Sequence, residues 1–389
     1  MNPPRVAIIR QKYNPSGGAE RFVSRAIEAL RGRGKAELWL LARDWIETPG
    51  IRFVRLAPFY LGRTWRDWSF SRAVCRHLAS ASFDLVQSHE RLACCDIYRA
   101  GDGVHREWLQ QRARRFGLLR KLAQVLSIHH RYVLRAEERM FRNPALECVI
   151  CISEMGREEV RRHFQVPESK LEVIYPGVDV DKFRPQLASE HRRPVRDSLG
   201  IPDDAFVLVY AGSGFERKGV DPALRAVAKS GLPCHLLILG RDKHAGRYRK
   251  LAKRLGLAGR AHFVGAKSDV RPYYAAADVF IMPSIYEPFG NANMEAMAMG
   301  LPVITSTKSG AAELVSAASA GHVCDALDVE AQARAIAALA DPAARAAAGR
   351  AARTVAERHS LPNMVDRLVA LYTRILAKRQ GNSAILRAL

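Results

Sequence analysis

The sequence predicts an α/β protein built from two parallel-sheet domains, each with helices on both faces of its sheet. Apolar runs of three to five residues alternate with longer amphipathic stretches, which is the pattern of strands joined by crossover helices. The pattern occurs twice along 389 residues, a length that suits two domains. Prolines and a glycine interrupt it between residues 176 and 194. We therefore expect domains at residues 1–184 and 185–358, and a last helix within 359–389 that can cross back to the first domain.

The elements of the first half follow from its apolar runs. Its predicted strands are Val6–Ile9, Leu38–Leu41, Leu85–Gln87 and Cys148–Ile152. Apolar residues recur at helical spacing in Ala19–Arg31 and Met155–Phe164, so we expect a helix in each.

The second half repeats the alternation. Its predicted strands are Phe206–Tyr210, His235–Leu239, His262–Val264, Val279–Met282 and Pro302–Thr305. A final amphipathic helix is expected at Leu361–Lys378. In parallel sheets of this kind ligands bind beyond the carboxyl ends of the strands, so two such domains would hold a ligand in the cleft between them.

The composition limits which classes of partner and which cellular compartment are expected. With 61 basic and 39 acidic residues the net charge is +22, which favours phosphate, nucleic acid or an anionic membrane as a partner. No apolar run approaches the roughly 18 residues of a membrane span, and none near the start is long enough for a signal peptide, so we expect a cytoplasmic protein. Seven cysteines suit free thiols in a reducing compartment. Cys148 and Cys151 would point to opposite faces of a strand, which argues against a shared metal.

Two motifs can bind phosphate. Gly17 and Gly18 follow the first strand and precede a helix, so backbone N–H groups could approach a diphosphate there; a plain tight turn would need the same glycines. Arg217 and Lys218 follow the Phe206–Tyr210 strand in a glycine-containing loop, where they could bind phosphate oxygens or form a solvated basic turn. The spacing is not that of a Walker loop.

Two glutamates eight residues apart form the third motif. Glu287 precedes a proline, so it should be extended in the loop after the Val279–Met282 strand. Gly290 should open a helix that carries Glu295 about one turn in. Carboxylates accept hydrogen bonds, which suits the hydroxyls of a sugar and a ribose.

These motifs, in this order along the chain, resemble those of retaining glycosyltransferase family 4, whose members have the GT-B fold of two Rossmann-like domains facing a deep cleft. The segments that carry the resemblance are Gly17–Arg21, Val149–Ser153, Ile174–Asp179, Phe215–Gly219, Ala276–Val279, Glu287–Glu295 and Gly300–Val303. Within the family, Lys12-Tyr13, Gly212–Asp221 and Gly240–Lys243 resemble the lipopolysaccharide core glucosyltransferases that act on heptose.

The resemblance implies roles for the donor site. Gly17 and Gly18 would form one half of the diphosphate site, while Arg217 and Lys218 would neutralise the leaving nucleotide diphosphate. Glu295 would bind the ribose. The remaining implied donor contacts are Glu287 with Phe289, Gly290 and Asn291 around the transferred sugar, and Val264 and Ala266 beside the base.

The resemblance also implies a reaction centre and a reaction. Asp102 would face the reacting atoms, with His105 as the alternative. The expected reaction moves a hexose from a nucleotide diphosphate sugar, with UDP-glucose as the expected donor, to a lipopolysaccharide-core or other lipid-linked saccharide with retention of configuration. Capsule or O-antigen assembly and nucleotide-sugar epimerisation are alternatives. No cofactor or metal is expected, because Asp179-Val-Asp181 spells a metal-binding DxD motif but lies in the hinge motif.

The segment Arg106–Arg142 is the most basic part of the first half. It holds ten Arg and Lys against three Glu, with apolar residues interleaved. Such a helix can lie on an anionic membrane, or pack on a core with a solvated basic face. We expect peripheral association with the inner membrane as one outcome. No nucleic-acid-binding module is recognised, so no specific nucleic acid partner is expected.

Overall fold

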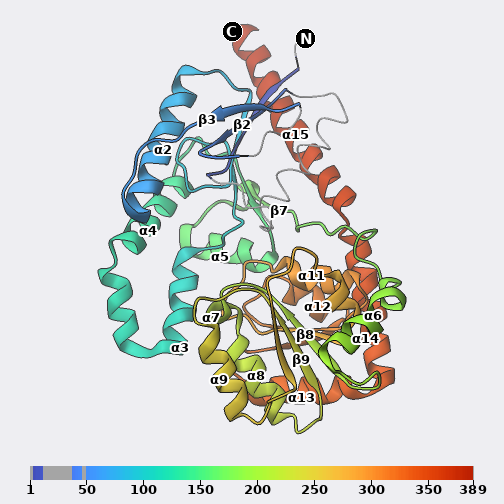
Figure 1. Ribbon diagram of the computed structural model, residues 1–389. Helices are drawn as coiled ribbons and strands as arrows, with labels where there is room; N and C mark the ends of the chain where they lie inside the picture. Colours follow the sequence, from blue (N-terminus) through green and yellow to red (C-terminus); the bar gives the residue numbers. More distant parts are fainter. Residues whose placement is uncertain (1–2, 12–36, 46–49, 389) are drawn as a thin grey trace. The chain divides into compact units, whose positions relative to one another are not determined.

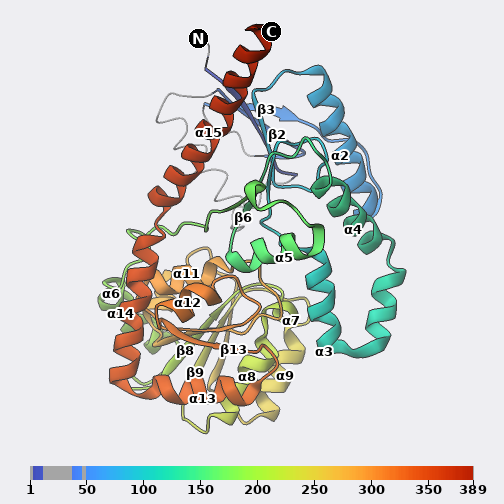
Figure 2. The same ribbon diagram turned by 180° about the vertical axis from the view of Figure 1, so that it is seen from behind.

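The computed structural model describes residues 3–11, 37–45 and 50–388, and divides into two compact units. Unit 1 comprises Met1–Tyr175 and Pro362–Leu389, and unit 2 comprises Pro176–Leu361. Each unit is a parallel sheet with helices on both faces, as the sequence predicts (Figure 1, Figure 2). The expected helix at Ala19–Arg31 lies outside the described residues.

Unit 1 contains a seven-stranded parallel sheet in the order β3-β2-β1-β4-β5-β6-β7. Its strands are β1 (Arg5–Ile9), β2 (Glu37–Ala42), β3 (Arg52–Arg55), β4 (Leu85–Ser88), β5 (Ile97–Arg99), β6 (Cys148–Cys151) and β7 (Leu171–Val173). The four predicted strands are confirmed as β1, β2, β4 and β6. The other three strands, β3, β5 and β7, have only three or four residues each and were not predicted.

Helices cover both faces of this sheet. They are α2 (Gly62–Ser80), α3 (His105–Leu126), α4 (Ile128–Phe141), α5 (Glu154–Phe164) and α15 (Leu361–Ala388), with a short 3-10 turn at Glu168–Lys170. The core of one face joins apolar side chains of α2, α4 and α5, such as Phe70, Met140 and Val160, to Val86 of β4. The neighbouring β4 residue, Gln87, accepts a 2.7 Å hydrogen bond from the Tyr372 hydroxyl, so α15 covers the opposite face (Figure 1, Figure 2).

Unit 2 contains a six-stranded parallel sheet in the order β10-β9-β8-β11-β12-β13. Its strands are β8 (Val207–Ala211), β9 (His235–Leu239), β10 (Ala261–Gly265), β11 (Val279–Met282), β12 (Val303–Ser306) and β13 (Gly321–Cys324). Its helices are α6 (Leu187–Leu199), α7 (Phe215–Lys218), α8 (Val220–Lys229), α9 (Ala245–Arg254), α10 (Arg271–Ala275), α11 (Asn291–Ala298), α12 (Ala312–Ala317), α13 (Val329–Ala340) and α14 (Pro342–Arg358). All five predicted strands are confirmed, and β13 is added at the edge.

The segment that follows Tyr175 belongs to unit 2, nine residues earlier than the domain boundary predicted from the prolines. Its backbone is held by the carboxyl end of the unit, since the N–H of Val178 donates to the carbonyl of His359 at 3.0 Å. The Arg353 guanidinium donates to the carbonyls of Val180 and Phe183 at 3.2 and 2.9 Å.

Pro194 lies inside α6, although we expected the prolines of this region to interrupt regular structure. Arg196 explains why the helix persists, because its buried guanidinium donates to the carbonyls of Ala276 and Asp203 at 3.0 and 2.7 Å and to Asp278 at 3.1 Å. These bonds anchor the helix to the rest of unit 2.

The expectation of free thiols alone is wrong for one pair, because a disulfide joins Cys75 of α2 to Cys94 after β4. The other five cysteines are free and buried. Val74 and Leu92 pack in the same core cluster, so the packing of α2 over the loop after β4 brings the two thiols together. Nothing in the local sequence pattern marks this pair.

Candidate active site

The candidate donor site lies in unit 2, where the order of its strands reverses. β8 and β11 are neighbours at this point. From β8 the strands continue through β9 and β10 to one edge of the sheet, and from β11 they continue through β12 and β13 to the other edge. A ligand that binds an open parallel sheet enters beyond the carboxyl ends of such a pair. Arg217 and Lys218 lie in α7 just after β8, and Glu287 follows β11, so all three predicted residues come to this edge.

Glu287 contacts both cations. Its Oε2 accepts a hydrogen bond from Nη1 of Arg217 at 3.0 Å and lies 3.4 Å from Nζ of Lys218. The Glu287 side chain is only 12% exposed. Burial by itself would raise the pKa of Glu287, but the charges of Arg217 and Lys218 and their hydrogen bonds outweigh it, and the pKa is lowered. The two cations therefore favour the carboxylate form of Glu287.

The backbone fixes this cluster from both sides. The N–H of Glu287 donates to the carbonyl of Lys308 at 2.9 Å, and the N–H of Gly310 donates to the carbonyl of Glu287 at 3.0 Å. The Arg217 carbonyl accepts from the N–H of Ile285 at 2.8 Å, which ties α7 to the same loop. These hydrogen bonds hold the charged groups in place before a ligand binds. The entropy of ordering them is therefore lost during folding and not during binding.

Gly290 opens α11, as predicted. Its φ is +88°, and a Cβ there would lie 2.6 Å from Nδ2 of Asn293, so only glycine fits. The helix begins at Asn291 and carries the buried Glu295 in its second turn. Phe289, also buried, accepts a 3.1 Å hydrogen bond from the Ser309 hydroxyl through its carbonyl. The amino end of α11 thus opens beside Glu287.

Val264 and Ala266 lie at the same carboxyl edge, two strands away from β8. Val264 is half-buried in β10, and Ala266 is exposed just beyond it. Between them the Gly265 carbonyl accepts from the N–H of Gly240 at 2.9 Å, which joins the ends of β9 and β10.

A second charged cluster occupies the matching point of unit 1, where β1 neighbours β4. Arg10 follows β1, and its Nη1 lies 3.4 Å from Glu90 and 3.9 Å from Oδ2 of Asp102. Arg91 lies 3.7 Å from the same Asp102 oxygen. Asp102 is 46% exposed, so it stands at the surface between two guanidinium groups. Gly17 and Gly18, which the sequence places after β1, lie outside the described residues.

The sequence argument did not single out Arg10, Glu90 and Arg91. A signal for them was present, because all three are charged residues within three positions of the end of β1 or β4, where a parallel sheet exposes its carboxyl edge.

His105 has other partners than Asp102. Its backbone N–H donates to Glu137 at 2.9 Å, and its ring Nε2 lies 3.0 Å from Nδ1 of His130. Burial, followed by the charge of Arg91, lowers the pKa of His105 to about 3. The ring is therefore neutral at physiological pH.

Asp179 of the DxD sequence caps a turn. Its Oδ1 accepts from the N–H of Lys182 at 3.0 Å. Across the described residues, no group of three or more His, Cys, Asp or Glu is placed to hold a metal ion. Within the same residues no helix combines the length and the apolarity needed to cross a membrane.

Two protein families match consecutive parts of the chain. The family described as Glycosyltransferase Family 4 matches residues 16–182, and the family described as Glycosyl transferases group 1 matches residues 191–355. The lipopolysaccharide glucosyltransferase WaaG of Escherichia coli K12 is 26% identical over 82% of this chain and 84% of its own. The lipopolysaccharide core biosynthesis glycosyltransferase LpsE of Rhizobium meliloti is 39% identical over 36% of this chain and 41% of its own.

Solved structures of similar fold cover nearly the whole chain. The crystal structure of WaaG matches with a TM-score of 0.79 and 24% identity, over 94% of this chain and 99% of that one. Anabaena Alr3699/HepE, solved in complex with UDP-glucose, matches with a TM-score of 0.72 and 19% identity, over 95% and 100%. The two parallel-sheet units are those of the GT-B fold, and since the two family matches together span most of the sequence, this chain belongs to the glycosyltransferases that join a family 4 domain to a group 1 domain.

Proposed function

We propose that this glycosyltransferase moves glucose from UDP-glucose to a saccharide of the lipopolysaccharide core or another lipid-linked acceptor, with retention of configuration. The observation that carries the proposal is the cluster of Glu287, Arg217 and Lys218 at the strand-order reversal of unit 2, beside the amino end of α11. A nucleotide diphosphate sugar carries both the negative charge and the hydroxyls that these groups recognise.

We assign the donor contacts as follows. Arg217 and Lys218 neutralise the diphosphate, and Gly17 and Gly18 complete its site. Glu295 binds the ribose. The hydroxyls of the transferred sugar meet Glu287 and the backbone of Phe289, Gly290 and Asn291, while Val264 and Ala266 border the base. Support for UDP-glucose comes from Alr3699/HepE, whose structure was solved with that compound, and from the glucosyltransferase activity named for WaaG.

The proposed reaction is a same-face displacement. The bond from the anomeric carbon to the diphosphate oxygen breaks, and the acceptor oxygen forms its bond to the same face of the sugar. The acceptor proton passes to the departing diphosphate. Negative charge grows on the diphosphate because the electrons of the breaking bond stay on its oxygen, and Arg217 and Lys218 stabilise that charge until the acceptor proton arrives. We propose that no metal or cofactor takes part.

On the acceptor side we assign Asp102 to the reaction centre, since it is the exposed carboxylate of the unit 1 cluster. The acceptor class follows from the names of two relatives, WaaG and LpsE, both tied to lipopolysaccharide. An enzyme with a lipid-linked acceptor works at a membrane surface, so we propose peripheral association through the basic helices α3 and α4.

One experiment tests the proposal. The full chain is incubated in chelator with a panel of nucleotide sugars and truncated lipopolysaccharide, and the product is analysed by mass spectrometry and NMR. We expect glucose from UDP-glucose in an α-linkage. A β-linked product contradicts retention, and a need for added divalent ion contradicts the metal-free route. Conversion of the donor alone would instead identify an epimerase, and transfer only to capsule or O-antigen precursors would reassign the acceptor.

A further inference from the structure

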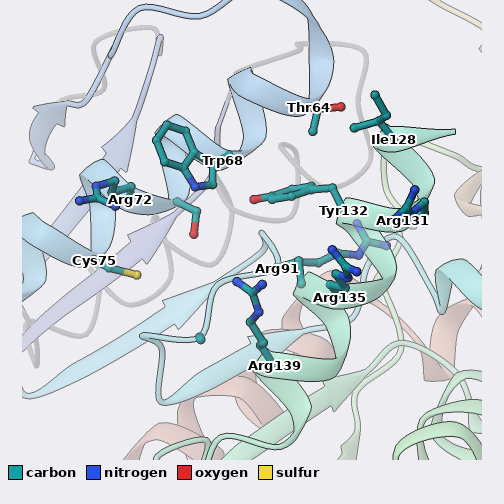
Figure 3. A pocket seen from close by; sticks show the side chains of 13 residues that line it. Thr64, Trp68, Arg72, Cys75, Arg91, Ile128, Arg131, Tyr132, Arg135 and Arg139 are labelled. Carbon is teal, nitrogen blue, oxygen red and sulfur yellow. The ribbon is translucent and has the colours of Figure 1, made fainter.

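A cavity of about 450 Å³ lies between α2 and α4 in unit 1 (Figure 3). Two helical stripes form its walls, with side chains that recur every three or four residues on each helix. We call it the arginine pocket, after the five arginines that line it: Arg72, Arg91, Arg131, Arg135 and Arg139. No Asp or Glu lines it.

Among the residues that the structure describes, most of the positive charge of the pocket has no carboxylate partner. Arg72, Arg131, Arg135 and Arg139 are exposed, and no carboxylate of the described residues forms an ion pair with any of the four. Of the five, Arg91 alone is paired within the described residues, with Glu137 at 2.9 Å and Asp102 at 3.7 Å.

The arrangement on α4 makes this charge costly. Arg131, Arg135 and Arg139 follow one another at intervals of four residues, so their like charges are neighbours on one face and repel. The two glutamates of the helix are used elsewhere: Glu137 by Arg91 and the N–H of His105, and Glu138 by Arg142 at 3.0 Å. If helix stability were the only constraint, a glutamate would be favoured at one of these three positions, because it would pair with an arginine one turn away. A bound anion would remove the repulsion.

Two aromatic side chains complete the pocket. Figure 3 shows Tyr132 of α4 extending across the pocket toward α2, where Trp68 lines the opposite wall. Trp68 is 46% exposed, although large aromatic residues are usually covered. Flat apolar faces beside fixed charges suit a ligand that has both a ring and an anionic group, and the volume falls in the range of small-ligand sites.

We propose that the arginine pocket binds a phosphate-bearing sugar of the acceptor. Several guanidinium groups favour a phosphate monoester over a carboxylate, because the monoester carries up to two charges and three acceptor oxygens. Arg91 links the pocket to the reaction side, since its Nη1 lies 3.7 Å from Asp102. A phosphorylated sugar held here anchors the acceptor next to the carboxylate assigned to the reaction centre. The inference rests on the proposed function for the identity of the acceptor.

The test compares two ligands and two double variants of the full chain. The ligands are the deacylated inner-core oligosaccharide of lipopolysaccharide with its phosphates and the same oligosaccharide after phosphatase treatment. The pocket variant is Arg135→Gln with Arg139→Gln. The control is Arg55→Gln with Arg76→Gln, which removes the same charge from exposed positions of β3 and α2 outside the pocket. Dissociation constants are measured by calorimetry, which needs no turnover.

We expect the wild type and the control to bind the phosphorylated oligosaccharide at least tenfold more tightly than the treated one, and the pocket variant to lose that preference. Equal binding of both ligands by the wild type overturns the proposal. So does equal weakening in the two variants, because that would mean diffuse attraction to the net charge.

A lipid headgroup offers the same phosphate chemistry, and vesicles of phosphatidylethanolamine and phosphatidylglycerol at 3:1 separate the two sources. If the pocket variant loses vesicle binding but keeps the phosphate preference for oligosaccharide, the pocket serves lipid and the proposal is wrong. Glucose transfer by the wild type is measured in parallel. Transfer without any phosphate preference overturns only the pocket, whereas absence of transfer to either ligand counts against the proposed function.

Discussion

The carboxylate of Glu287 lies 3.0 Å from Nη1 of Arg217, although the two residues are 70 positions apart in the chain. The pair joins the loop after β11 to the helix after β8, and Lys218 adds a second cation to the same oxygen. A diphosphate bound by these cations shares them with Glu287. If the donor binds here as we propose, its binding is coupled to the position of the carboxylate that we assign to the transferred sugar.

Loss of either donor-site cation should slow the chemical step. For Lys218→Ala or Arg217→Ala we expect kcat to fall by about 10²–10³-fold, the effect of removing one group that stabilises developing charge. The control is Arg225→Ala, which removes an exposed arginine paired with Asp221 in α8. Steady-state kinetics with UDP-glucose measures the effect. A change only in KM would mean that the cations bind the donor without favouring the transition state.

Removal of Glu295 should weaken donor binding. A hydrogen bond from a ribose hydroxyl to a carboxylate contributes about 1.5–3 kcal/mol, so Glu295→Ala should raise the Kd for UDP by about tenfold to a hundredfold. Titration calorimetry with UDP measures this directly. The comparison variant is Glu330→Ala, which loses only a surface pair with Lys229. Unchanged affinity in Glu295→Ala would refute the ribose assignment.

The Glu287 cluster should make unit 2 sensitive to acid. The folded-state pKa of Glu287 is lowered below its ordinary 4.5, so its contribution to stability is fully present above pH 4.5 and is lost as pH falls through the lowered value. The protection of residues 279–299 from hydrogen exchange, taken relative to the intrinsic rate, which itself falls with pH, should therefore decrease between pH 4.5 and 3 in the wild type. Glu287→Gln should show a smaller change over that interval. An identical pH dependence in both proteins would contradict the lowered pKa.

Asp102 and His105 can be separated by their pH profiles. We expect Asp102→Asn to reduce kcat by about 10²-fold or more, as loss of a group that stabilises the transition state does. His105 has a pKa of about 3 and hydrogen-bonds to His130, so His105→Gln should leave the profile of kcat/KM between pH 5 and 9 unchanged in shape. An ionisation near 6.5 that disappears in His105→Gln would transfer the role to the histidine.

The Cys75–Cys94 disulfide should stabilise unit 1. It closes a loop across 19 positions, for which restriction of the unfolded chain predicts about 3 kcal/mol in the free energy of unfolding. All five tryptophans belong to unit 1, so their fluorescence during urea unfolding reports on this unit. Reduction should lower the stability of the wild type and leave Cys75→Ser/Cys94→Ser unaffected. A count of seven free thiols in protein denatured without reductant would contradict the pairing.

The strands that were not predicted from the sequence lack a long buried apolar run. β3 has the sequence Arg-Phe-Val-Arg and lies exposed at the sheet edge, so it has no apolar run to detect. β5 has three residues and ends in the buried Arg99. The helix α2 was missed as well, since only Ser69, Phe70 and Val74 of its 19 residues are buried. Apolar patterning finds elements buried on their long faces and misses those that are short, edge-placed or mostly exposed.

The candidate site was predictable to the extent that it is local. Pro288 and Gly290 predicted the loop and the start of α11, because each restricts the backbone at its own position. The contact of Glu287 with Arg217 was not predictable from the sequence, because it depends on β8 and β11 lying side by side in the sheet. The charged cluster around Asp102 depends in the same way on where β1, β4 and β5 end.

The hydrogen bond from Tyr372 to Gln87 bears on the order in which the two units can finish folding. The ribosome makes unit 2 as one continuous stretch, whereas unit 1 receives Leu368, Tyr372 and Ile375 of α15 only after unit 2 has been made. Until then one face of β4 is uncovered and the Gln87 amide lacks its phenolic partner. The unit that is translated first is therefore the last to finish folding, and a nascent chain holds a complete unit 2 before unit 1 closes.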